Sequence, residues 1–80
     1  MTGYYEQLIE ISKDYLGPAA ERFIRRQIEF HLEKDPRDLT KEDVGRLAEW
    51  IATALSLLTQ DKKMVEESGR RIRALVKNNV

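Results

Sequence analysis

Apolar side chains return every three to four residues along almost the whole of this 80-residue chain, and this spacing restricts its fold more than any other feature. An α-helix turns by 100° per residue, so such a repeat puts apolar side chains on one face and charged side chains on the other. The two prolines, Pro18 and Pro36, divide the repeat into separate segments. We therefore predict an all-α fold, with residues 1–80 forming a single domain, a compact bundle of about four helices.

Local sequence signals place the ends of these helices. Gly17-Pro18 is typical of a helix corner, because glycine suits the position just after one helix and proline suits the first turn of the next. Pro36 disfavours helical geometry in the residue before it and ends the second helix. Thr40 and Asp43 have the spacing of a capping box at the start of the third. The predicted helices lie near residues 3–16, 18–33, 41–59 and 61–77.

The third predicted helix is the most apolar, and we expect it to be the central one, with Ile51 and Leu55 in the middle of its apolar arc. Its arc is wider than three neighbouring helices readily cover. Trp50, Ala54 and Leu57 lie at the flank of that arc and form a candidate surface for a protein partner or a second copy of the chain. The alternative is that Trp50 folds over the first or fourth helix as part of the core.

The second predicted helix carries two polar residues where a core is expected. Its apolar arc comprises Ala20, Phe23, Ile24, Ile28, Phe30 and Leu32, and the helical wheel places Gln27 and His31 within the same face, one turn apart. We predict that they form a buried polar pair, or that His31 lies at the margin of the buried face. His31-Leu32-Glu33-Lys34 also resembles the His-x-x-Lys core of histidine phosphotransfer domains. Two departures oppose that hypothesis. The motif normally continues with glycine and lies in the middle of a helix, whereas here Asp35-Pro36 ends the helix; it also lies on an exposed face, whereas His31 is expected to point inward.

Nucleic-acid binding is an alternative function, because arginines gather at two places in the chain. One predicted face carries Arg22, Arg25 and Arg26, and the other carries Arg70, Arg71 and Arg73. Helix pairs joined by short turns are also how recognition helices are presented to DNA. The opposing interpretation is a solvated surface, since acidic residues lie one helical turn from most of these arginines. The chain holds 14 basic and 14 acidic residues, so it has no net charge to attract a polyanion.

Several classes of chemistry have no support in the sequence. The chain has no cysteine, which excludes thiol catalysis, disulfides and zinc–thiolate sites. A single histidine offers no convergent set of metal ligands, and the scattered glycines form no phosphate-binding loop. The helical pattern puts nearly all carboxylates on solvated faces, where they cannot work as a buried acid–base pair. We expect no enzyme activity, no catalytic residues, no cofactor and no bound metal.

We predict a cytoplasmic protein with no membrane contact, because the chain has no cysteine and no apolar run near the ~20 residues of a membrane span. The residues that follow Met1 also lack the pattern of a signal peptide.

One helix corner resembles a known type of module. The Leu-Gly-Pro helix corner of small helical modules appended to bacterial signalling proteins, such as kinases and response regulators, is similar to the segment Tyr15-Leu16-Gly17-Pro18-Ala19-Ala20-Glu21-Arg22-Phe23-Ile24. The resemblance rests on this corner, Leu16-Gly17-Pro18, and implies a non-catalytic domain that mediates contacts within a signalling chain. We therefore predict a protein–protein interaction or regulatory module.

Overall fold

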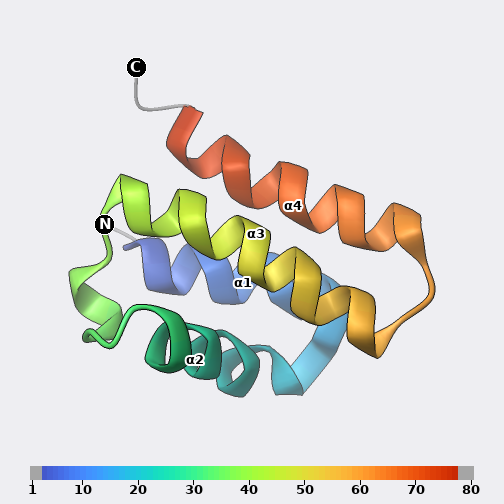
Figure 1. The fold of residues 1–80 in the computed structure, drawn as a ribbon, viewed down its shortest axis with the longest axis horizontal. Coiled ribbons are helices and arrows are strands. Elements are labelled where there is room, and N and C mark those ends of the chain that lie inside the picture. Colours follow the sequence, from blue (N-terminus) through green and yellow to red (C-terminus); the bar gives the residue numbers. More distant parts are fainter. Residues whose placement is uncertain (1–2, 78–80) are drawn as a thin grey trace.

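The computed structural model describes residues 3–77 and is helical, without strands, within that range (Figure 1). This confirms the predicted all-α fold. The elements are α1 (Tyr4–Leu16), the short 3-10 helix η1 (Gly17–Ala19), α2 (Ala20–His31), the short 3-10 helix η2 (Pro36–Asp38), α3 (Lys41–Leu58) and α4 (Lys62–Lys77).

The helix corner at Gly17 forms as the sequence indicates. Gly17 has a φ of +58°, which glycine adopts at little cost, and its backbone N–H donates to the carbonyl oxygen of Lys13 in the last turn of α1. Pro18 then enters a 3-10 turn instead of α2 itself, so α2 begins at Ala20 and not at residue 18. At the other end α2 stops at His31, earlier than the predicted residue 33. Glu33 has a φ of +50°, which lies outside the right-handed helical region, so the helix cannot continue through this residue.

The start of α3 has the predicted capping box. The Thr40 hydroxyl oxygen accepts a hydrogen bond from the Asp43 backbone N–H at 3.2 Å, and the Asp43 carboxylate accepts one from the Thr40 backbone N–H at 3.0 Å. Lys34 adds an ion pair, because its Nζ donates to Asp43 Oδ2 at 2.7 Å. The Asp43 side chain is only 13 % exposed, so this pair also ties the loop after α2 to the first turn of α3.

Asp43 is expected to make the stability of the protein depend on acid pH. Burial by itself raises the pKa of Asp43, but hydrogen bonds from Lys34 and Thr40 outweigh burial and leave the pKa below its ordinary value of 3.8. The contribution of the carboxylate is therefore complete above that ordinary value and is lost as the pH falls through the lower, folded-state pKa. We expect Asp43→Ala to lower the free energy of unfolding by about 1–2 kcal/mol at neutral pH. Urea titrations at several pH values measure the difference in free energy of unfolding between the variant and the wild type, and this difference should shrink in acid. A difference that stays constant down to about pH 2 would contradict the role given to the Asp43 carboxylate.

The core lies between the helices and draws on each of them. The buried apolar side chains that pack together here are Leu8, Ile9, Ile11, Ile24, Ile28, Val44, Leu47, Ala48, Ile51, Leu55 and Ile72. Ile51 and Leu55, placed by the wheel in the middle of the arc of α3, are both in this core. α3 contributes more of these side chains than any other helix.

α3 packs against two of the other three helices, as expected of the central helix, although α1 also packs against two. α3 lies along α4 on one side and against α2 on the other, whereas α1 lies against α2 and α4, so the helices surround a shared core (Figure 1). An 18-residue helix in such an arrangement keeps one side on the outside of the bundle. That outer side of α3 is where its surplus apolar residues come to the surface.

Candidate interaction surface

The ring of His31 lies flat on the ring of Trp50 and joins the end of α2 to the middle of α3. The two ring centroids are 4.0 Å apart and the planes differ by 7°. Trp50 is 46 % exposed, so it is neither a core residue nor a free side chain. The imidazole covers one face of the indole, and about half of the residue remains open to solvent. Stacking in this way fixes the orientation of a large aromatic group at the surface of the protein.

The other two residues of the predicted surface continue from Trp50 along α3. Ala54 is half-buried, and Leu57 is 83 % exposed. Trp50, Ala54 and Leu57 follow the i, i+4, i+7 spacing of the anchor residues by which one helix recognises another. The structure therefore leaves two of the three predicted residues open to solvent, and it turns their shared edge toward α2, where His31 lies.

Two exposed apolar side chains were not among the predicted surface residues. Phe30 is 74 % exposed and Leu58 is 66 % exposed. Phe30 precedes His31 in the last turn of α2. Arg25, on one edge of α2, lies toward Tyr5 of α1. The helical wheel puts Phe30 on the opposite edge of α2 from Arg25. Phe30 thus belongs to the edge of α2 that is turned away from α1, on the side of α3. Its position at the rim of the predicted apolar arc was the signal that could have identified it.

We define the apolar face as five apolar residues at the surface of α2 and α3: Phe30, Trp50, Ala54, Leu57 and Leu58. It includes every large apolar side chain that is exposed among the described residues. The other helices, α1 and α4, present polar and charged side chains to solvent. An apolar surface confined to one pair of helices in this way is typical of a place where another protein packs.

The predicted buried pair of Gln27 and His31 does not form. His31 is exposed and contacts Trp50, while the Gln27 side-chain oxygen is buried without a hydrogen-bond partner. The wheel gave the correct direction for His31, but His31 is the last residue of α2, and no neighbouring helix covers it there. Exposure removes one of the two departures from the phosphotransfer motif. The other departure stands, because α2 ends at this residue, and the phosphotransfer hypothesis stays untested.

The arginines of the two predicted nucleic-acid faces have different surroundings. Arg71 is half-buried and paired with α1, since its Nη1 lies 2.7 Å from Asp14 Oδ2 and donates to the Tyr15 hydroxyl at 3.1 Å. The Tyr15 hydroxyl in turn donates to Glu67 at 2.7 Å, and this network joins α1 to α4. The exposed arginines of the two faces are Arg22, Arg25, Arg26, Arg70 and Arg73. Because Arg71 is already paired within the protein, it is less available to a phosphate group, and the second predicted face has one free arginine fewer. Nucleic-acid binding remains a prediction.

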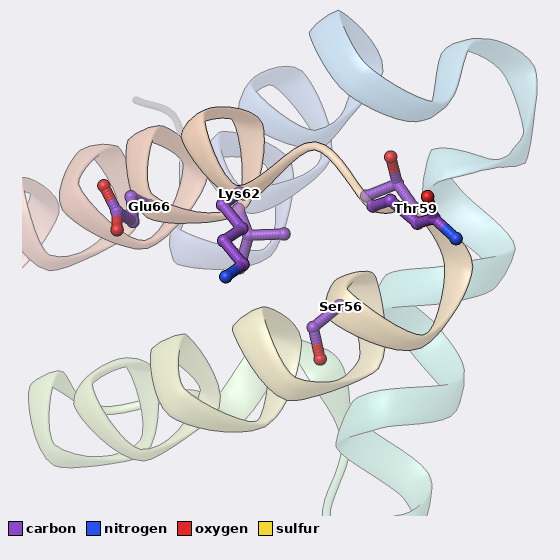
Figure 2. A pocket seen from close by; sticks show the side chains of 6 residues that line it. Ser56, Thr59, Lys62 and Glu66 are labelled. Atoms are coloured by element: carbon purple, nitrogen blue, oxygen red, sulfur yellow. The ribbon is translucent and has the colours of Figure 1, made fainter.

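A second candidate site is an open groove between the end of α3 and the start of α4. It has a volume of about 560 Å³ and is lined by Ser56, Thr59, Gln60, Lys62, Val65 and Glu66. Figure 2 shows Ser56 on α3 across from Lys62 and Glu66 on α4, with Thr59 in the linker. The Ser56 hydroxyl already donates to the carbonyl oxygen of Thr53 at 2.6 Å. No residue pattern predicts this groove, because the path of the linker between α3 and α4 creates it.

Within residues 3–77 no three His, Cys, Asp or Glu side chains are grouped so that they could hold a metal ion. No described helix is both long enough and apolar enough to cross a membrane.

Comparison of the chain with models of known protein families, with curated proteins and with solved structures found no match.

Proposed function

We propose that the protein is a non-catalytic interaction module that binds an amphipathic helix of a partner protein on the apolar face. One observation carries the proposal: the exposed large apolar side chains, Phe30, Trp50, Leu57 and Leu58, belong to two adjoining helices, α2 and α3. Removing such a surface from water contributes roughly 25 cal/mol for each Å² of apolar area. A helix is the partner that fits, because a helix can pack against the two adjoining helices and bury its own apolar side there.

The stacked pair supplies the anchor of this surface. Tryptophan is enriched among the residues that dominate binding energy at protein interfaces. Trp50 is held in one orientation by His31, so less side-chain freedom is lost when a partner covers it. The resemblance of the Leu16-Gly17-Pro18 corner to modules of signalling proteins supports the idea that the partner is a signalling protein, and cytoplasmic location is part of the same proposal.

A binding experiment with a model helix tests the proposal. The probe is an end-blocked peptide of about 20 residues with leucine on one face and glutamine on the other, long enough to form a helix when bound and free of ionisable groups. Trp50 is the only tryptophan in the chain, so its emission reports directly on this surface. We expect a saturable blue shift that is unchanged by added salt, because apolar contacts are not screened. A protein that neither binds the peptide nor associates with itself in sedimentation experiments would contradict the proposal.

A further inference from the structure

A pocket opens where the first turn of α1 meets the second half of α2 and η2. It has a volume of about 390 Å³, within the range of small-molecule sites, and is lined by Tyr5, Arg25, Glu29, Asp35, Pro36 and Arg37. Three separate segments of the chain supply these residues, and α1 packs against both α2 and η2 (Figure 1). None of them belongs to the apolar face, so what this pocket binds is independent of the proposed function.

The hydroxyl group of Tyr5 is an unsatisfied polar group at this pocket. Its oxygen is buried and has no hydrogen-bond partner among the residues that the structure describes. The Arg25 guanidinium lies close enough for the tyrosine oxygen to raise the pKa of Arg25. A guanidinium can only donate hydrogen bonds, so the hydroxyl proton still lacks an acceptor. Buried polar groups without a partner are rare and costly, and an acceptor placed between Tyr5 and Arg25 would satisfy both donors.

The charged side chains of the pocket differ in what they already bind. Asp35 and Arg37 satisfy each other: the Asp35 carboxylate accepts from the Arg37 backbone N–H at 2.8 Å, from its Nε at 3.3 Å and from its Nη2 at 3.2 Å. Arg25 and Glu29 lie one helical turn apart on α2, and neither belongs to an ion pair within the described range. The pocket therefore offers a ligand one cation and one anion at neighbouring positions.

We propose that this pocket binds a free apolar α-amino acid. The carboxylate of the ligand accepts hydrogen bonds from Arg25 and from the Tyr5 hydroxyl, which the exposed and flexible Arg25 side chain uncovers by turning aside. The ammonium group of the ligand pairs with Glu29. A guanidinium suits a carboxylate because its N–H groups match the two oxygens. A ligand with only one of the two charges leaves Glu29 or Arg25 without a partner, so the pocket selects a zwitterion.

A smaller hollow beside the pocket has room for an apolar side chain. It has a volume of about 160 Å³ and shares Tyr5, Pro36 and Arg37 with the pocket. Its other lining residues are Gly3, Tyr4, Glu6 and Leu39. The Tyr4 ring, Pro36 and Leu39 offer apolar surface, from which an aliphatic group would displace water. Leucine is therefore a suitable probe.

Binding of L-leucine to the full 80-residue chain at neutral pH tests the proposal. In NMR titrations we expect saturable shifts of the backbone amides of α1, α2 and η2 that surround the pocket. Two analogues of leucine separate its charges: 4-methylpentanoate lacks the ammonium group and 3-methylbutylamine lacks the carboxylate. Each should bind about tenfold more weakly, because one charge-assisted interaction is lost. Absence of saturable shifts with leucine, or equal binding of either analogue, would overturn the proposal.

Tyr5→Phe is the sharpest variant, because the hydroxyl has no partner in the ligand-free protein. Its removal should leave unfolding in urea unchanged or move it to higher denaturant, and should weaken leucine binding about tenfold. Arg25→Gln should weaken leucine binding as well. The matched control is Arg22→Gln, which removes an exposed arginine of the same helix that does not line the pocket and should leave binding unchanged. Unchanged leucine binding by Tyr5→Phe would show that water satisfies the hydroxyl and would contradict the proposed site.

The position of the shifts separates this proposal from the proposed function. Leu57→Glu, a change on the apolar face, should leave leucine binding as it is in the wild type. Shifts centred on Trp50, or loss of leucine binding in Leu57→Glu, would place leucine on the apolar face and overturn the pocket as its site. A protein that binds leucine at the pocket but no helical peptide would keep this inference and lose the proposed function.

Discussion

Leu55→Ala is expected to lower the free energy of unfolding by about 2–5 kcal/mol, the range for removing a large buried aliphatic side chain. Leu55 is 2 % exposed in the core, where it packs among residues of the other helices. The cost has two parts: the lost transfer free energy of the side chain and the cavity that a close-packed interior cannot fully close. For a domain of this size such a loss is a large share of the total stability. Urea or thermal unfolding measures it.

Leu57→Ala is the matched control, because it makes the same chemical change on the same helix. Leu57 is 83 % exposed, so its replacement by alanine should change the free energy of unfolding by no more than about 0.5 kcal/mol. If both substitutions had similar effects, the assignment of buried and exposed sides of α3 would be wrong.

Leu57→Glu is expected to leave the fold intact and to weaken binding of the model helix at least tenfold. The substitution removes apolar area from the apolar face and puts a carboxylate where the partner must exclude water. A loss of about 1.4 kcal/mol already corresponds to a tenfold change in the dissociation constant, and full burial of a leucine is worth more than that. The emission of Trp50 measures the binding, and unfolding in urea measures the stability of the variant.

Gln60→Glu is the control for the added charge. Gln60 is exposed in the linker between α3 and α4, lines the groove shown in Figure 2 and is not one of the residues of the apolar face. This variant should bind the peptide as the wild type does. If Gln60→Glu abolished binding and Leu57→Glu did not, the groove would be the binding site. If Leu57→Glu unfolded the protein, its side chain would belong to the monomer core and the proposed function would lose its physical support.

Much of the local structure could be predicted because its causes lie within a few residues of sequence. The capping box of Thr40 and Asp43 needs only a spacing of three residues, and the corner at Gly17 needs only a residue that tolerates positive φ. Burial of Ile51 and Leu55 follows from the angle at which each leaves the helix. These features depend on covalent geometry and on short-range hydrogen bonds, which the order of residues specifies directly.

His31 and Leu58 show what only the tertiary structure decided. The wheel places His31 between Ala20 and Ile24, and Leu58 between Leu47 and Ile51, so each points in the direction of the core. Yet each is the last residue of its helix, and both are exposed. Periodicity gives the angle of a side chain around the helix axis, whereas its burial also depends on whether a neighbouring helix reaches the same level along that axis. The contact of His31 with Trp50, and with it the composition of the apolar face, was therefore decided by how α2 and α3 pack together.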